Sequence, residues 1–283
     1  MIPGVGYFYS GLTNQKSALS ILLLSFIATS IVLVQWFIAG YGLVYASDGG
    51  SFIGTFTKAF FMNIDINTAV PYPEFAFVFF QATFACIAPA LVIGGAADRG
   101  RMLPKMIFVF LWSFLVYDPI AYWCWNNKGW LHVNGVLDFA GGSPVHISSG
   151  FAALAYVLMV GQRKVKKTAS GDPYSPVSVI LGTLLLWFGW NGFNGGSALL
   201  ANGRATAAMV ATNLAASSAS ITWIIMDFMK KGKITSTGFC AGAISGLVVI
   251  TPCSGFVGPT SAIVFPANLV YWSYRCCLLF SKW

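Results

Sequence analysis

Long stretches without a charged residue are the feature that most constrains the fold of this chain. Ser17 to Ser47, Phe75 to Ala97 and Ile234 to Tyr274 contain no Asp, Glu, Lys or Arg. Only 8% of the 283 residues are charged, whereas a soluble domain carries about 25%. Because so few charges cannot cover a globule with solvated side chains, most of the surface must meet something other than water. A soluble enzyme and a disordered region are both disfavoured.

The charge-free runs predict membrane-spanning helices, because a helix needs about 20 mainly apolar residues to cross the hydrocarbon core. The last run is divided by glycine and proline clusters at 251–255 and 258–259, which allow one helix before them and another after. The expected fold class is therefore an all-α multi-pass membrane protein. About seven spans are expected, near residues 19–46, 75–97, 104–125, 144–162, 176–200, 205–228 and 237–252, and an eighth is allowed near 260–280.

The basic residues between these spans are concentrated in every second loop. By the positive-inside rule the loops that carry them face the cytoplasm. The intervening loops, which face outward, hold only Lys58, Lys128 and Arg204. This asymmetry accounts for the net charge of +8 without a nucleic-acid partner. The residues of the cytoplasmic set are Lys16; Arg99, Arg101 and Lys105; Arg163, Lys164, Lys166 and Lys167; and Lys230, Lys231 and Lys233.

Histidine, cysteine and glycine give no sign of a catalytic or metal centre. The two histidines, His132 and His146, fall in an expected outer loop and an expected span. The cysteine spacing fits no zinc site, and cysteines in apolar spans usually behave as small hydrophobic residues. Glycines recur at spacings that let transmembrane helices approach closely. We therefore expect no metal, no cofactor and no enzymatic activity.

Polar residues inside a span are costly and normally face a cavity or another helix. His146 is such a residue, and Asp138 stands eight positions before it at the expected entrance of the span. On a continuous helix this spacing separates them by about 12 Å, too far for a hydrogen-bonded pair. His146 either contributes to a functional cavity or bonds to a neighbouring helix. Asp138, beside two glycines, fits a helix cap equally well.

Aromatic residues gather at two places on the expected outer side. Phe80 and Phe84 lie one turn apart on one helix face, and Tyr122, Trp123 and Trp125 cluster at the outer end of another span. Anchoring at the membrane interface is a common role of tryptophan at this depth. Rings around a depression can instead hold a cation, at about 0.5–2 kcal/mol for each contact. The pattern favours a small cationic substrate.

The segment Asp138–Gly150, DFAGGSPVHISSG, resembles the signature of the ammonium transporter family, the Amt, Mep and Rh proteins. It is most similar to the fungal Mep branch, and Trp125 disfavours an Rh-type channel. Further similar segments stand in the family's order on both sides of this segment, at Phe8–Leu12, Phe80–Ile87, Trp187–Ser197 and Gly246–Pro252. The resemblance implies an eleven-span fold built as an inverted repeat. It also implies a homotrimer with a pore in each protomer, located in the plasma membrane.

The resemblance also implies roles for individual residues. An outer site that recruits ammonium would combine aromatic rings with a hydroxyl that accepts an N–H bond, from Phe80, Phe84, Trp125 and Ser197. Phe84 and Phe193 would form a stacked gate below that site. His146 corresponds to the first of two pore histidines that contact ammonia and relay a proton. Asp138 corresponds to an acidic residue that supports the vestibule without touching the substrate.

A charge in a dry pore is costly, and this cost favours one mechanism. A bare cation costs on the order of tens of kcal/mol to desolvate in the idealised limit, whereas neutral ammonia needs only a hydrogen-bond partner. We therefore expect a transporter subunit that recruits ammonium from the outer side, deprotonates it and conducts ammonia through the bilayer. The alternatives are a sensor or regulatory membrane protein with the same recruitment site, and a non-conducting fragment of the family.

The length of the chain departs from the family pattern. The family's second pore histidine lies near the end of its tenth span, and the only other histidine here, His132, lies in an expected outer loop. The first helix of the family extends upstream of Met1, and the residues after 265 no longer resemble the family. We therefore expect a membrane domain at residues 1–265 that is truncated at both ends, followed by a tail of different character at 266–283.

Overall fold

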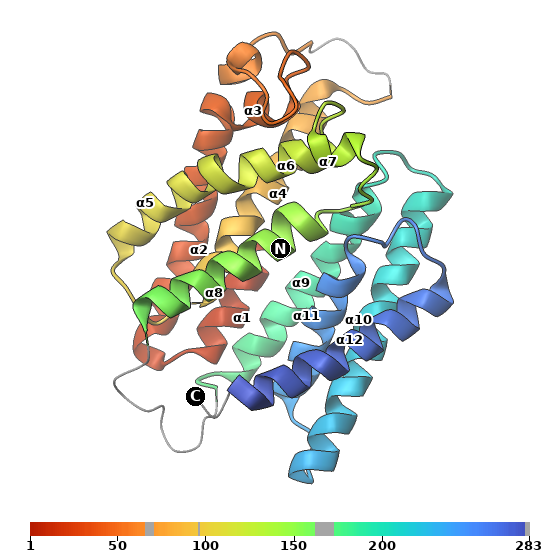
Figure 1. The fold of residues 1–283 in the computed structure, drawn as a ribbon. Helices are drawn as coiled ribbons and strands as arrows, with labels where there is room; N and C mark the ends of the chain where they lie inside the picture. The colour runs from red at the N-terminus through yellow and green to blue at the C-terminus, as the bar shows by residue number, and fades with distance from the viewer. Residues whose placement is uncertain (66–70, 96, 162–172, 281–283) are drawn as a thin grey trace.

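A computed structural model describes residues 1–65, 71–95, 97–161 and 173–280, with Cys276–Phe280 described as backbone alone. Regular structure in these ranges is helical throughout (Figure 1). A helix satisfies its own backbone hydrogen bonds, which hydrocarbon cannot do. The long helices are α1 Ile2–Leu12, α2 Gln15–Gln35, α4 Glu74–Gly95, α5 Met102–Trp112, α8 Ser148–Val160, α9 Pro176–Gly196, α10 Gly203–Lys231, α11 Ser236–Ile250 and α12 Pro259–Phe280.

Shorter helical segments extend or connect the long ones. Two π-helical turns, η1 Trp36–Gly40 and η3 Ser113–Tyr117, carry α2 into α3 and α5 into α6 without ending the span. A third, η4 Gly142–Ile147, leads into α8. The remaining segments are α3 Tyr41–Tyr45, the 3₁₀ helix η2 Phe56–Phe61, α6 Asp118–Trp125 and α7 Trp130–Val133.

Six helices of the described chain are long and apolar enough to cross a membrane. α11, at the place of the seventh expected span, is apolar but shorter. The breaker cluster after it forms turns, and α12 lies where an eighth helix was allowed. The all-α multi-pass class is therefore confirmed. The six spans are Gln15–Tyr45, Glu74–Gly95, Met102–Val133, Gly142–Val160, Pro176–Gly196 and Gly203–Lys231.

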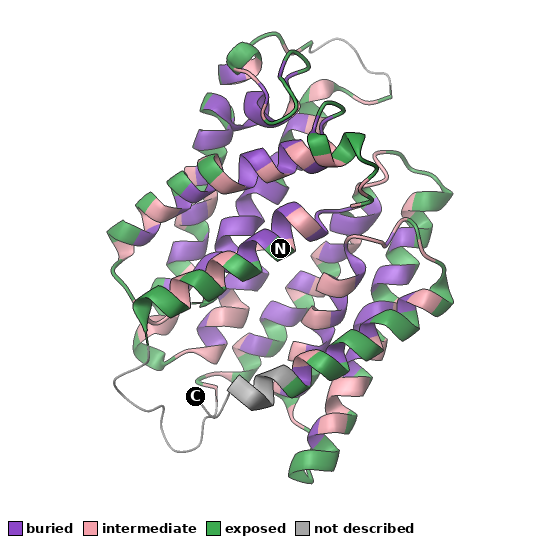
Figure 2. Cartoon of the chain, viewed as in Figure 1, coloured by how far each residue is buried: buried purple, intermediate pink, exposed green. Residues whose placement is uncertain are grey.

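The helices lie side by side with their buried faces toward one another, while exposed residues follow their outer faces (Figure 2). Large apolar side chains are abundant on the outside: Leu19 is 76% exposed, Phe79 68% and Phe188 82%. In water such a surface would aggregate, whereas in a bilayer it meets acyl chains. The exposed apolar surface therefore agrees with the membrane environment predicted from the charge-free runs.

The two π-turn spans are joined by a buried polar contact. The Gln35 side-chain amide donates to the Asp118 carboxyl group at 2.6 Å, and the two residues are 1% and 0% exposed. Gln35 directly precedes η1 and Asp118 directly follows η3, so each π turn brings a polar residue toward the other span. Such turns often accompany irregular packing at functional or structural sites.

The described loops of the predicted cytoplasmic set lie at one end of the molecule, opposite the loops predicted to face outward. The α1–α2 junction with Lys16, the α4–α5 connection with Arg99 and the end of α10 with Lys230 lie toward the lower part of Figure 1. η2 with Lys58 and the α6–α7 connection with Lys128 lie toward the upper part. The basic run predicted for the α8–α9 loop, Arg163, Lys164, Lys166 and Lys167, lies outside the described residues.

Close helix packing explains the recurring glycines of α11. A Cβ atom on Gly246 would lie 2.4 Å from the Ala215 carbonyl oxygen of α10, and one on Gly242 would lie 2.8 Å from that of Ala219. Both distances are too short for a side chain. The predicted packing role of these glycines is confirmed. In α12, the chain passes from residue 265 to 266 within one helix, so the domain boundary predicted there falls inside α12.

Candidate functional site

A stacked pair of phenylalanines lies at the centre of the predicted site. Phe84 comes from α4 and Phe193 from α9, and their ring centroids are 4.2 Å apart with planes inclined at 30°. Both rings are buried, with 1% and 6% of their surface exposed. Stacked and edge-on arrangements are the favoured geometries of aromatic pairs. The two residues that the resemblance named as a gate are therefore in contact.

Two further rings contact Phe84. Phe80 meets it edge-on at 4.9 Å, as expected for residues one turn apart. Trp125 meets it edge-on at 5.6 Å, and its indole nitrogen donates to the Asp138 carbonyl oxygen at 3.1 Å. Phe80 and Trp125 are half-buried. The three rings predicted for the outer site thus form one aromatic cluster.

Ser197 lies one turn beyond Phe193, directly after the end of α9. Its hydroxyl donates to the Phe193 carbonyl oxygen at 2.8 Å. Because the hydroxyl proton is used in this bond, the oxygen lone pairs remain available as acceptors. A Cβ atom on the neighbouring Gly196 would lie 2.9 Å from the Phe80 ring, which places this end of α9 beside the aromatic cluster.

Asp138 stabilises the loop that precedes η4. Its carboxylate accepts the backbone N–H groups of Gly141 at 2.8 Å, Gly142 at 2.7 Å and Ser143 at 2.5 Å. Gly141 has φ = 101°, a left-handed conformation that favours glycine. The capping interpretation is confirmed. The assumption of a continuous helix from Asp138 to His146 is wrong, because the helical turns begin only at Gly142.

His146 lies between aromatic rings on the inner side of the gate. Its ring stacks on Trp190 at 5.4 Å and 20°, and Phe193 lies 6.1 Å away. Its Nε2 atom is buried and has no hydrogen-bond partner within the described part of the chain. The ring lines a narrow cavity of about 40 Å³ together with apolar side chains of α1, α4, α9 and α11. Nε2 is thus free of a structural hydrogen bond.

Trp190 is a site residue that the sequence reasoning missed. It stacks on His146, and its Nε1 donates to Thr251 Oγ1 at 2.8 Å. Its position three residues before Phe193 places both side chains on one face of α9. That spacing was a usable signal. The other histidine, His132, faces the Cys124 carbonyl oxygen near the outer end of α6, with Nδ1 at 3.3 Å from that oxygen.

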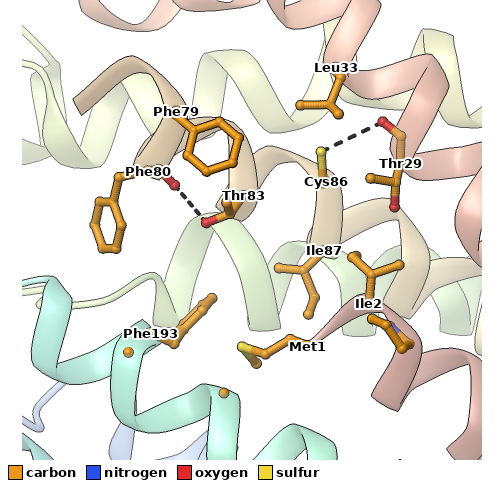
Figure 3. Close-up of a pocket in the computed structure, with 13 residues that line it drawn as sticks. Met1, Ile2, Thr29, Leu33, Phe79, Phe80, Thr83, Cys86, Ile87 and Phe193 are labelled. Atoms are coloured by element: carbon orange, nitrogen blue, oxygen red, sulfur yellow. Dashed lines mark hydrogen bonds between the residues drawn. The ribbon is translucent and has the colours of Figure 1, made fainter. Parts of the chain in front are cut away.

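A larger apolar hollow of about 510 Å³ lies on another side of the gate, between α1, α2, α4 and α9 (Figure 3). Phe80 and Phe193 border it, so it adjoins the aromatic cluster. The hydrogen bonds drawn there end on backbone carbonyls: Thr83 Oγ1 donates to Phe80 at 2.7 Å, and Cys86 Sγ donates to Thr29 at 3.7 Å. This lining is suited to apolar groups rather than to a cation.

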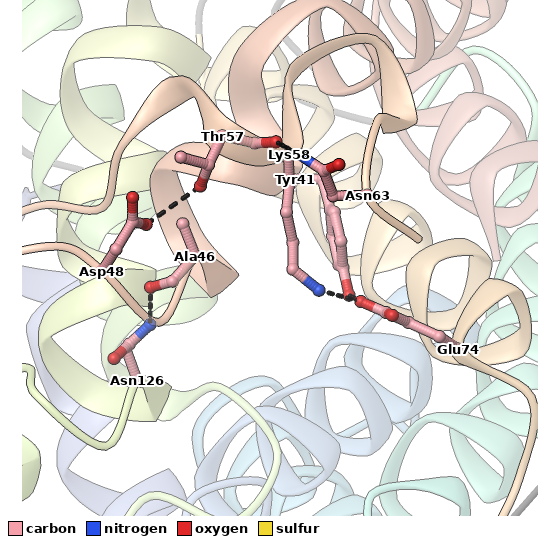
Figure 4. Close-up of polar contacts among 8 residues, drawn as sticks. All are labelled: Tyr41, Ala46, Asp48, Thr57, Lys58, Asn63, Glu74 and Asn126. Atoms are coloured by element: carbon pink, nitrogen blue, oxygen red, sulfur yellow. Dashed lines mark hydrogen bonds and ion pairs between the residues drawn. The ribbon is translucent and has the colours of Figure 1, made fainter. Parts of the chain in front are cut away.

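Polar contacts on the outer side connect the loop after α3 to the neighbouring helix ends (Figure 4). Lys58 forms an ion pair with Glu74, and the Tyr41 hydroxyl donates to Glu74 at 2.8 Å. The Asn126 amide donates to the Ala46 carbonyl oxygen at 3.2 Å. Each of these contacts joins segments distant in sequence, so the cluster serves to hold the outer loop in place.

Asp48 forms a smaller cluster in the same loop. Its carboxylate accepts the hydroxyl groups of Thr55 at 2.5 Å and Thr57 at 2.9 Å. The bond from Thr55 is the main cause that lowers the pKa of this carboxyl below its ordinary value, followed by Thr57 and nearby Lys128. Asp48 is exposed, so water screens these interactions.

Fold and site together define a multi-pass membrane protein in which an outer aromatic cluster leads, past a stacked pair of rings, to a buried histidine. A family model described as Ammonium Transporter Family matches residues 1–278. The chain belongs to the ammonium transporter family. The recognition made from the signature segment is confirmed, and the match continues beyond residue 265.

Curated and solved relatives agree with this assignment. The chain is 52% identical over 282 residues to ammonium transporter 1 of Schizosaccharomyces pombe, covering 99% of this chain and 57% of that protein. The crystal structure of Saccharomyces cerevisiae Mep2 superposes with a TM-score of 0.89 at 43% identity, covering 95% of this chain and 63% of that one. A structure titled Sensor Amt Protein superposes with 0.87 at 29% identity, covering 96% and 69%. The chain therefore spans a little over half the length of the curated relative.

Proposed function

We propose that this chain is a subunit of an ammonium transporter in the plasma membrane, with the aromatic cluster as its recruitment site. Phe80, Phe84 and Trp125 form a cluster whose ring faces attract a cation, at about 0.5–2 kcal/mol for each cation–π contact. Ser197 offers an oxygen whose own proton is already donated. Ammonium, which has only N–H donors, matches this combination, and the oriented hydroxyl beside the rings is the observation that carries the proposal.

The stacked pair acts as the selective barrier. With centroids 4.2 Å apart, Phe84 and Phe193 leave no room between them for a hydrated ion. Potassium and sodium cannot shed their charge, so they meet the full cost of dehydration. Ammonium can lose a proton and continue as neutral ammonia. The gate therefore selects ammonium over potassium and sodium in two ways: by excluding hydrated ions, and because only ammonium can pass as a neutral molecule.

His146 receives ammonia beyond the gate. Its Nε2 has no partner among the described residues and its ring lines a narrow apolar cavity, where one hydrogen bond to the imidazole would replace a bond to water. An imidazole can accept a proton at one nitrogen and release it from the other. His146 thus supplies both the hydrogen-bond partner for ammonia and a step of the proton relay. Asp138 acts indirectly, by holding the loop on which Trp125 and η4 depend.

A chain of polar contacts between α9 and α10, on the exposed side of these two helices, supports assembly into a homotrimer. The Trp187 indole donates to Asn213 Oδ1 at 2.8 Å, and the Asn213 amide donates to Asn191 Oδ1 at 2.7 Å. Asn213 is exposed although it lies in the middle of α10. Polar side chains at membrane depth are costly against lipid. A neighbouring protomer in the assembled transporter covers them.

Reconstitution into vesicles tests the proposal. Purified protein in proteoliposomes is given an outward-to-inward ammonium gradient, and internal pH and ionic current are recorded. We expect ammonium-dependent flux, a raised half-saturating concentration in Ser197→Ala, and potassium leakage in Phe193→Ala. Leu115→Ala, on an exposed apolar position of η3, is the matched control. A folded protein that binds no ammonium and conducts none contradicts the proposal.

A sensor function is the second candidate, and the similarity to the structure titled Sensor Amt Protein favours it. Both functions use the recruitment site, but only a transporter moves substrate. Binding of ammonium, detected by a change in tryptophan fluorescence that Trp125→Phe abolishes, combined with absence of flux in the same vesicles, would identify the sensor.

A further inference from the structure

We infer that Thr251 is a positioning residue for His146 and acts through Trp190. Thr251 follows α11 directly and is fully buried, and Trp190 is 2% exposed. The inference rests on the proposed function only for its effect on transport. The geometric part, that a hydroxyl directly after α11 sets the orientation of an imidazole on η4, holds independently of that function.

The Thr251 hydroxyl is engaged on both sides. It donates to the Leu247 carbonyl oxygen at 2.7 Å and accepts the Trp190 indole N–H at 2.8 Å. Because its proton is directed back along α11, its lone pairs face Trp190. A buried indole N–H without a partner costs about 1–3 kcal/mol, so this acceptor selects one orientation of the indole plane among those that the space allows.

The orientation of the indole is passed on to the imidazole by stacking. The Trp190 and His146 planes are nearly parallel, at 20° and 5.4 Å. Phe193 borders both rings, at 5.6 Å from Trp190 and 6.1 Å from His146. Since Nε2 of His146 has no hydrogen-bond partner among the described residues, ring contacts hold the imidazole plane. A change in the indole plane therefore changes the direction in which Nε2 points.

The turn that contains Thr251 also contacts the loop before η4. The Phe139 N–H donates to the Pro252 carbonyl oxygen at 2.8 Å, and a Cβ atom on Gly142 would lie 2.5 Å from the Pro252 ring. Adjacent residues of one turn thus act on the segment of His146 at two places. Pro252 contacts the start of that segment at Phe139 and Gly142, and Thr251, through Trp190, positions the ring of His146.

This arrangement predicts a separation of two transport parameters. The Thr251 hydroxyl bonds to Leu247 and Trp190, neither of which belongs to the proposed recruitment site, so we expect substrate affinity at the outer site to be retained without the hydroxyl. Transfer of ammonia and the proton at His146 depends on the direction of Nε2, and misplacement of a reacting group lowers the rate of such a step. Loss of the hydroxyl therefore lowers maximal flux and leaves the half-saturating ammonium concentration unchanged.

The variants are Thr251→Val, which keeps the shape and removes the hydroxyl, and Thr251→Ser, which keeps the hydroxyl. Thr183→Val is the matched control, because Thr183 is also a buried threonine, 2% exposed, that bonds within its own helix. In vesicles we expect Thr251→Val to lose about tenfold in maximal flux at unchanged half-saturation. Thr251→Ser and Thr183→Val stay within about twofold of the original protein.

A second measurement does not require transport. The sequence has two histidines, so His132→Ala assigns the imidazole Hε1 resonance of His146 in the detergent-solubilised protein. Because the imidazole stacks on the Trp190 ring, the shift of this resonance reports the stacking. We expect Thr251→Val to move this resonance and Thr251→Ser and Thr183→Val to leave it in place.

The two measurements separate the inference from the proposed function. A moved resonance in a protein that never conducts ammonium supports the positioning role and counts against transport. An unmoved resonance in folded Thr251→Val overturns the positioning role whether or not the protein conducts. Equal loss of flux in Thr183→Val and Thr251→Val also overturns it, because the loss would then reflect general packing.

Discussion

Asp138 and His146 stand eight residues apart, at the two ends of one segment, and differ in how their polar atoms are used. The Asp138 carboxylate accepts three backbone N–H groups. The His146 imidazole is enclosed by rings and leaves Nε2 without a partner in the part of the chain that is described. Both residues looked like functional candidates in the sequence. The difference shows that a polar group with a complete set of internal bonds maintains structure, whereas one held by shape alone remains available to a substrate.

The largest effect on stability is expected at Asp138. Asp138→Ala leaves three N–H groups of the turn without their acceptor, which we expect to destabilise the fold by about 4 kcal/mol, at about 1–3 kcal/mol for each lost partner. Asp138→Asn keeps one acceptor oxygen and should cost about half as much. Thermal unfolding of the solubilised protein measures both. A Tm of Asp138→Ala equal to that of the original protein would contradict the structural role.

At His146 the opposite result is expected. His146→Phe keeps a flat ring between Trp190 and Phe193 and removes the nitrogens. We expect a change in stability of about 1 kcal/mol or less, because no hydrogen bond of Nε2 is lost. Ammonium flux should fall at least about tenfold, which corresponds to about 1.4 kcal/mol in the barrier. Flux and Tm are measured on the same preparation. A large loss of Tm with flux intact would reverse the assignment of the two residues.

The turn that serves Asp138 gives a smaller effect. Gly141→Ala places a side chain at φ = 101°, and the left-handed conformation costs about 1–2 kcal/mol for other residues. A Cβ atom there would also lie 2.9 Å from Val145. Tm should therefore fall by less than in Asp138→Ala. Gly135→Ala is an informative control, because Gly135 has φ = 80° but no atom within 4 Å of a Cβ position.

The smallest effect on stability is expected at Asp48, which tests whether a hydrogen-bonded carboxylate matters when it is exposed. Its carboxylate also accepts several hydrogen bonds, but it is exposed. Its folded-state pKa is lowered, chiefly by Thr55, so its contribution is present above the unfolded-state pKa and is lost as pH falls through the lower folded-state pKa. We expect Asp48→Asn to leave Tm unchanged at pH 7 within error and to remove only a slight dependence on pH under acidic conditions. A large loss at pH 7 would show that bond number matters regardless of burial.

Several parts of the site were predictable from local spacing. Phe80 and Phe84 lie one turn apart and do contact each other, and the glycines beside Asp138 indicated a cap that is found. The separation of Asp138 and His146 was not predictable, because it assumed a helix where the chain forms a left-handed turn. The role of Trp190 was missed, although its spacing from Phe193 was visible, because its two partners lie on other elements.

The surroundings of the chain and the class of fold follow from the sequence alone. Charge-free runs of this length are compatible only with hydrocarbon surroundings, and there the backbone must form helices to satisfy its own bonds. Which polar atoms are bonded and which are free depends on the tertiary packing of the helices. Trp190 and Thr251 are separated by 61 residues, and such a contact depends on how three helices pack rather than on any local pattern. The difference between bonded and unbonded polar atoms matters because they are buried: a polar atom inside a membrane protein costs free energy when it has no hydrogen-bond partner, unless a substrate bonds to it.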